Sequence, residues 1–214
     1  RTKRLFSVFA DKTFYEYNTS GTRTTVALDG TATAWPSTPT NISFEVMNNL
    51  LIIAANGATQ IPKKWAGVGN NVFDLGGTPP YFSICRQHLG RLWANDTTNL
   101  DRLHYTTTGN PEEWLGIGDS GALDIGIGDG DPSGITAIFP TFKGDLFVAK
   151  KTKLYRVTGN TPESFEVRLV SSGIGCASHN SITPVDQDDL VFCSERGFHS
   201  LIATANFGDF EGAF

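Results

Sequence analysis

Short runs of apolar and β-branched residues, four to six positions long, follow one another along the whole chain. Glycine, asparagine or aspartate bounds most of these runs, and no segment shows the i, i+3, i+4, i+7 spacing of an amphipathic helix. Short runs separated by turn residues are typical of antiparallel strands. The pattern therefore predicts an all-β protein. The strands are expected at Arg4–Phe9, Thr13–Tyr17, Thr24–Leu28, Ile42–Met47, Leu50–Ala55, Tyr81–Cys85, Arg91–Ala94, Arg102–Thr106, Ile135–Phe139, Asp145–Ala149, Leu154–Thr158, Phe165–Val170, Ser181–Val185, Leu190–Cys193 and Phe198–Leu201.

One unit recurs along the chain, and its second strand aligns on Leu5, Leu51, Leu92, Leu146 and Leu190 at spacings of 46, 41, 54 and 44 residues. A four-stranded antiparallel unit needs about 40–50 residues, which is the period of a β-propeller blade. A meander sandwich is the alternative, but its strands would alternate apolar and polar positions more strictly than runs such as IIAA and LVFC do. We therefore predict a β-propeller of four-stranded antiparallel blades, about four blades plus partial ones.

The 54-residue spacing indicates an insertion at 116–134, which is rich in glycine and aspartate and contains no cationic residue. We expect this segment to form a long loop on one rim. The chain begins with Arg1 and its only methionine is Met47, so we expect it to be an excerpt of a larger protein. Within a single propeller region, 1–214, the predicted blades lie near 1–30, 42–76, 80–128, 135–170 and 181–214.

Composition and charge narrow the function classes. Charged residues make up 18% of the 214 positions and aromatic residues 11%, which excludes a disordered chain or a coiled coil. A net charge of −5 argues against a domain that grips nucleic acid. No apolar run approaches the ~18 residues of a membrane span. The three cysteines form no CxxC pair. We expect no cofactor, no metal and no membrane partner.

Two motifs in the segment 116–134 resemble known sites. The tetrapeptide GDSG at 118–121 is similar to the nucleophile segment of chymotrypsin-like proteases, but none of the four histidines has the sequence context of the base that this chemistry needs. Asp124, Asp129 and Asp131 could bind a cation, yet the segment lacks the alternating carboxylates and the twelfth-position glutamate of an EF-hand loop. We interpret these acids as turn residues.

Propellers also host glycosidases, which act through a pair of carboxylates. The Asp-box pattern Ser-x-Asp-x-Gly-x-x-Trp of sialidase blades has no clean copy here. The nearest match, TTTGNPEEW at Thr106, lacks the aspartate and the glycine at the required places. We therefore expect no enzyme, and a glycan-binding or glycosidase-like propeller stays open as the alternative.

Three phrases resemble the propeller of tail nozzle and tail hub proteins (tail tubular B-like or stabilisation proteins) of short-tailed bacteriophages. They are PPYFSICRQHLGRLWANDTTNLDRLHYTTTGNPEEW, DGDPSGITAIFPTFKGDLFVAKKTKLYRVTG and IGCASHNSITPVDQDDLVFCSERGFHSLIAT. The resemblance covers residues 80–205 well and 1–66 loosely. The matching positions are Arg91, Leu92, Trp93, Asn110, Pro111 and Trp114 in the first phrase, Asp129, Gly130, Asp131, Ile135, Pro140, Leu146, Lys150, Tyr155 and Gly159 in the second, and Gly175, Ser178, Phe192, Ser194, Gly197 and Leu201 in the third.

The resemblance implies a structural role in the virion tail, after assembly in the host cytoplasm. Such proteins form a ring, typically a hexamer, below the portal and adaptor and around the channel used for genome ejection. The implied partners are other copies, the portal, the adaptor and other tail proteins. Because an acidic chain attracts phosphate weakly, genomic DNA would pass through the lumen without specific binding. The candidate subunit or partner contacts are Asp119, Asp124, Asp129 and Asp131 of the insertion, and Lys150, Lys151 and Lys153 of an expected solvated hairpin.

Overall fold

The regular structure of the chain is almost entirely β. The computed structural model describes residues 5–8, 12–69, 71–140, 144–185 and 189–202. Besides strands, these residues form two short 3-10 helices, η1 (Pro162–Ser164) and η2 (His179–Ser181). The all-β prediction is confirmed, and no helix in this part of the chain is long and apolar enough to cross a membrane. Parts of the predicted strand Arg4–Phe9 and of the predicted blades 1–30 and 181–214 lie outside the described residues.

The strands form antiparallel meanders in chain order. One four-stranded sheet consists of β8 (Cys85–His88), β9 (Arg91–Asn95), β10 (Arg102–Tyr105) and β11 (Gly121–Asp124). The next consists of β12 (Ala137–Pro140), β13 (Leu146–Ala149), β14 (Leu154–Thr158) and β15 (Glu166–Ser171). A three-stranded sheet follows, with β16 (Thr183–Pro184), β17 (Leu190–Ser194) and β18 (Gly197–Ser200).

The N-terminal part contains a further four-stranded meander with three more strands attached to its edge. The meander consists of β4 (Ile42–Met47), β5 (Leu50–Ala55), β6 (Lys63–Trp65) and β7 (Asn71–Asp74). The attached strands are β1 (Leu5–Val8), β2 (Phe14–Tyr17) and β3 (Arg23–Leu28). Strand β3 pairs in parallel with β7 through two residue pairs, so the first two units share one sheet.

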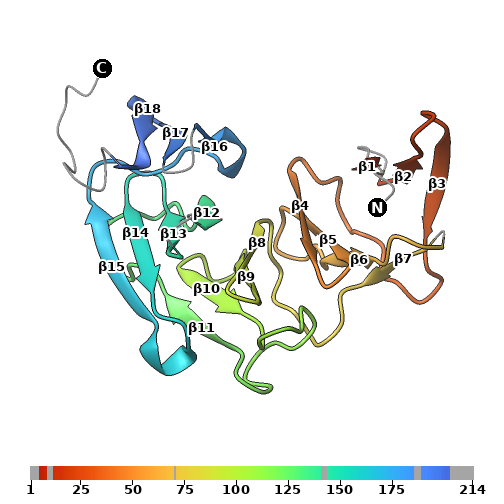
Figure 1. The fold of residues 1–214 in the computed structure, drawn as a ribbon, viewed down its shortest axis with the longest axis horizontal. Helices are drawn as coiled ribbons and strands as arrows, with labels where there is room; N and C mark the ends of the chain where they lie inside the picture. Colours follow the sequence, from red (N-terminus) through yellow and green to blue (C-terminus); the bar gives the residue numbers. More distant parts are fainter. Residues whose placement is uncertain (1–4, 9–11, 70, 141–143, 186–188, 203–214) are drawn as a thin grey trace.

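The sheets follow one another along an arc, as blades do around a propeller axis. Figure 1 shows β4, β8, β12 and β16 towards the inside of the arc and β7, β11, β15 and β18 towards the outside. The inner strands β4 and β8 are neighbours, as are β8 and β12. The Asn180 Nδ2 donates to Asn41 Oδ1 at 3.3 Å, which joins the segment before β16 to the segment before β4.

The β8–β11 and β12–β15 blades bury side chains on both of their faces. In β9, Leu92 and Ala94 pack towards β5 of the preceding sheet, whereas Trp93 packs in the cluster that contains Val148 of β13. In β13, Val148 faces β9, and Phe147 lies in the cluster shared with Phe192 of β17. Burying a side chain of this size completely stabilises the fold by roughly 1.5–3 kcal/mol relative to leaving it exposed to water. Burial on both faces explains why these strands are continuous apolar runs.

The structure corrects two expectations about local elements. The strand expected at Tyr81–Cys85 begins only at Cys85, because the Asn95 side-chain oxygen accepts the backbone N–H groups of Ser83 and Ile84 and withdraws them from the ladder. The segment 116–134 does not form one long loop. Its central residues form β11, the fourth strand of a blade, which pairs antiparallel with β10.

Candidate functional site

The ammonium group of Lys150 is buried between two blades. Its Nζ lies 2.6 Å from Asp101 Oδ1, on the β9–β10 connection, and 3.1 Å from Asp129 Oδ2, on the segment between β11 and β12. The same nitrogen donates to the backbone carbonyls of Gly126 at 3.2 Å and Asp131 at 3.4 Å. The Lys150 side chain has no exposed surface. Four oxygen atoms from the preceding blade and its exit segment therefore surround one buried cation.

The acids around this cation are themselves held by hydrogen bonds. The Tyr155 hydroxyl donates to the Asp129 carboxylate, and the Asp131 N–H donates to Asp129 Oδ1 at 2.8 Å. Asp131 Oδ2 accepts both the N–H and the hydroxyl of Thr152 at 2.7 Å. We call Lys150, Asp101, Asp129, Asp131 and Tyr155 the Lys150 joint. It fastens the turn between β13 and β14 to the chain that leaves the preceding blade.

Electrostatics in the Lys150 joint favours the charged forms of its acids and of its cation. Burial opposes the charge of Asp131, but hydrogen bonds from Ser133 and Thr152 hold the pKa of its carboxyl group well below the usual value. Burial also lowers the pKa of Lys150, and the carboxylates of Asp101 and Asp129 more than reverse that effect. Burial and the adjacent Asp129 raise the pKa of the Tyr155 hydroxyl. Tyr155 is therefore a neutral hydrogen-bond donor at pH 7.

A second buried cation, Arg91, lies in the preceding blade. Its Nη1 donates to the backbone carbonyls of Thr106 at 2.8 Å and Asp119 at 2.9 Å, and its Nη2 pairs with the Asp119 carboxylate. The guanidinium carbon lies 5.6 Å from the centre of the Tyr105 ring and 5.8 Å from that of Phe165, at the start of the outer strand of the next blade. The Arg91 guanidinium lowers the pKa of Asp119 to about 2.

The remaining candidate contact residues lie nearer the surface. Asp124 pairs with Arg102 at 2.7 Å, and Lys153 Nζ donates to the backbone carbonyl of Ser172 at 3.4 Å. The expectation of a solvated basic hairpin is wrong for Lys150, which is buried, whereas Lys151 is exposed. Contact of these residues with another subunit stays a prediction.

The protease-like and calcium-like motifs also have structural partners. Ser120 Oγ donates to the Ile117 carbonyl and accepts the Gly116 N–H, and Asp119 is paired with Arg91. Throughout the described ranges, no group of three or more His, Cys, Asp or Glu side chains could hold a metal ion.

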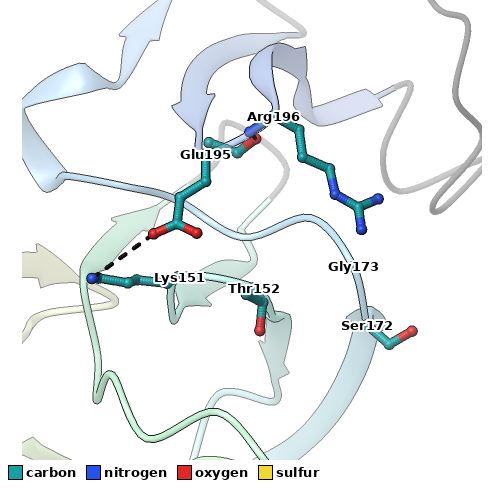
Figure 2. A pocket seen from close by; sticks show the side chains of 7 residues that line it. Lys151, Thr152, Ser172, Gly173, Glu195 and Arg196 are labelled. Atoms are coloured by element: carbon teal, nitrogen blue, oxygen red, sulfur yellow. Dashed lines mark hydrogen bonds and ion pairs between the residues drawn. The ribbon is translucent and has the colours of Figure 1, made fainter.

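A polar pocket of about 360 Å³ lies between the β12–β15 sheet and the β16–β18 sheet (Figure 2). Its walls come from the β13–β14 turn, the chain after β15 and the β17–β18 turn. The lining consists of charged side chains, hydroxyl side chains and one glycine, without an aliphatic or aromatic residue. The lining residues are Lys151, Thr152, Ser172, Gly173, Ser194, Glu195 and Arg196.

Two cations of this pocket differ in how they are paired. Lys151 Nζ lies 3.8 Å from Glu195 Oε1, and the two side chains are 52% and 60% exposed. The Arg196 guanidinium has no ion pair or side-chain hydrogen bond with any residue that the structure describes, and Figure 2 shows it on the side of the pocket opposite Lys151. Sequence reasoning found Lys151 but missed Glu195 and Arg196, because only the fold brings the two turns together.

Comparison with known proteins shows the fold. No family model and no curated protein matches the chain. YCF48 bound to a D1 peptide is similar in structure at 10% identity, with a TM-score of 0.61 over 90% of this chain and 58% of that chain. Hsv2 of Kluyveromyces lactis is 15% identical, with a TM-score of 0.56 over 100% and 64%. These proteins are β-propellers.

The chain folds as part of a β-propeller. A catalytically inactive virginiamycin B lyase from Staphylococcus aureus, in complex with quinupristin, is also similar, at 17% identity and a TM-score of 0.56 over 93% of this chain and 66% of that chain. The chain spans 58–66% of the length of these three structures. Because the identities are low and the neighbours include both an enzyme and non-enzymatic propellers, the similarity shows the architecture alone.

Proposed function

We propose that this chain is part of the β-propeller of a bacteriophage tail nozzle or tail hub protein. In this role it forms part of the wall of the ring below the portal and adaptor. The observation that carries the proposal is where the residues that match the sequence phrases of this class lie in the fold. Of these residues, Asp129, Asp131, Lys150 and Tyr155 belong to the Lys150 joint, and Arg91 is a buried cation of the preceding blade. Part of the resemblance therefore lies at residues that connect one blade to the next.

Two glycines of the same phrases support this interpretation, since each lies where a side chain cannot fit. A Cβ atom at Gly175 would lie 2.1 Å from the carbonyl oxygen of Lys150. Gly159 has a φ of +99°, and a Cβ atom there would lie 2.2 Å from the carbonyl oxygen of Ser164. Both positions set the close approach of chain segments within the blades. A wall that keeps its shape while a polymer passes requires this kind of fixed geometry.

The surface of the segment 116–134 supports contact with a second copy. Leu115 and Ile117, at its start, are 60% and 51% exposed, and Ile127 is 66% exposed. Neighbouring exposed apolar side chains on a turn are typical of interaction surfaces. Rings are built from heterologous interfaces, in which two different patches of each subunit meet. The net charge of −5 suits a lumen that does not hold DNA.

Mass photometry of the purified protein, followed by electron microscopy of particles that contain it, tests the proposal. We expect a ring of about six copies, and a Leu115→Asp, Ile117→Asp variant that folds normally by circular dichroism but remains monomeric. A protein that stays monomeric at all concentrations and is absent from virion tails would contradict the proposal. Binding or hydrolysis of glycans by that monomer would favour the glycan-binding or glycosidase-like alternative.

A further inference from the structure

We propose that the polar pocket between the β12–β15 sheet and the β16–β18 sheet is a binding site for an oxyanion group, a phosphate or a carboxylate. The group would bind in the pocket lined by Arg196 and Lys151, which come from turns of different sheets and lie on opposite sides of it (Figure 2). This inference goes beyond the structural role proposed above and does not depend on it.

Arg196 differs in its pairing from the other arginines that the structure describes. Within the ranges that the structure describes, every other arginine has an acidic, carbonyl or aromatic partner, and Arg196 has none for its guanidinium. A guanidinium group offers five N–H donors in a planar fork that matches two oxygens of a carboxylate or phosphate. The other arginines are Arg23 against Tyr15, Arg86 with Glu45, Arg91 with Asp119, Arg102 with Asp124, Arg156 with Asp145 and Arg168 with Glu166.

The walls of the pocket are held in place by hydrogen bonds behind the lining. The N–H of Arg196 donates to Ser194 Oγ at 2.9 Å, and that hydroxyl is 2.7 Å from His199 Nε2. On the opposite wall, Thr152 is fixed by its two hydrogen bonds to Asp131 of the Lys150 joint. The two cations therefore project from turns whose backbones are already ordered, which reduces the entropy cost of binding.

Charge and size define the class of ligand. Lys151 and Arg196 carry two positive charges, Glu195 carries one negative charge, and Lys153 lies beside the pocket on the carbonyl of Ser172. The absence of an apolar side chain from the lining excludes a ligand that binds by hydrophobic burial. A volume of about 360 Å³ accommodates a phosphate or the carboxylate end of an acidic side chain.

Glu195 competes with such a ligand for Lys151. Its carboxylate lies 3.8 Å from the ammonium group, and both side chains are more than half exposed, so the pair is weak and easily exchanged. An incoming oxyanion would replace the Glu195 carboxylate at Lys151 and add the contacts of Arg196. Removal of the Glu195 charge should therefore strengthen binding, which a merely structural role of this residue would not produce.

Isothermal titration calorimetry with inorganic phosphate, and separately with a tetraglutamate peptide, tests the inference on the whole protein. We expect saturable binding of at least one probe in about the millimolar range of Kd. The Arg196→Ala variant should weaken it about tenfold or more, and Glu195→Gln should strengthen it about threefold. Arg168→Ala is the matched control, since it removes an exposed arginine from β15 outside the pocket and should leave the affinity unchanged.

The two probes distinguish the source of the oxyanion. Binding of phosphate alone assigns a free or ester phosphate, and binding of the peptide alone assigns carboxylates of an acidic protein segment. The inference is overturned if neither probe saturates, or if Arg196→Ala and Arg168→Ala behave alike. Circular dichroism of each variant shows whether it is folded, and Lys151→Ala provides a second variant of the same pocket. Ring assembly does not enter these measurements, so failure here and failure of the proposed tail role are separate results.

Discussion

Replacement of Lys150 by methionine removes the buried cation of the Lys150 joint and keeps most of the side-chain volume. The change leaves the carboxylates of Asp101 and Asp129 without their ammonium partner. Loss of one partner of a buried ion pair costs about 3–5 kcal/mol. Because the Asp101 and Asp129 side chains are 32% and 12% exposed, water can reach them in part, and we expect the lower end of that range, about 3 kcal/mol.

Urea unfolding followed by tryptophan fluorescence measures this loss, since Trp93 is buried in the core between the same two blades. Lys151→Met is the control because the neighbouring lysine is exposed and weakly paired, and it should cost less than about 0.5 kcal/mol. Adding Asp129→Asn to Lys150→Met should recover part of the loss, as one unpaired charge disappears. A loss below about 1 kcal/mol, or equal losses for Lys150→Met and Lys151→Met, would refute the reasoning.

Three further results are expected. Burial lowers the pKa of His179 from 6.5 to about 3, so the folded state excludes a proton that the unfolded state binds, and His179 alone should lower the stability by about 1.2 kcal/mol between pH 7 and pH 5.5. His179→Asn, which keeps an acceptor for the Ile138 N–H, should flatten that acid limb in urea unfolding at several pH values. Gly175→Ala should destabilise the fold by about 2 kcal/mol or more, while Gly30→Ala, with open space around its Cβ, should leave the thermal midpoint unchanged.

The repeat of buried second strands could be predicted from the sequence because a blade buries both faces. Strands β5, β9, β13 and β17 were expected close to their observed places, since each is an apolar run between turn residues. Strands β6, β7 and β11 were not predicted. Their residues are polar or glycine-flanked, and they form because a strong neighbouring strand offers a ladder to pair with.

The buried cations show why the candidate site was predicted only in part. Lys63 lies in β6 with its side chain fully buried, 2.5 Å from Asp74, and Lys150 is buried beside Asp101. A lysine next to turn residues is typical of a solvated surface, and nothing local indicates the distant carboxylate that allows its burial. Arg196 is the opposite case, because only the packing of two turns shows that it faces a pocket.

The direction of the Lys150 joint along the chain has a consequence for synthesis. During synthesis Asp101 and Asp129 leave the ribosome before Lys150, so the joint cannot close until the turn after β13 has emerged. Until then these carboxylates are unpaired charges beside an apolar face, the arrangement by which gatekeeper residues oppose the association of unfinished chains. Lys150 neutralises them only after β12 and β13 of the next blade have been made. The joint therefore fixes the angle between the two blades only after the first strands of the second blade have been made.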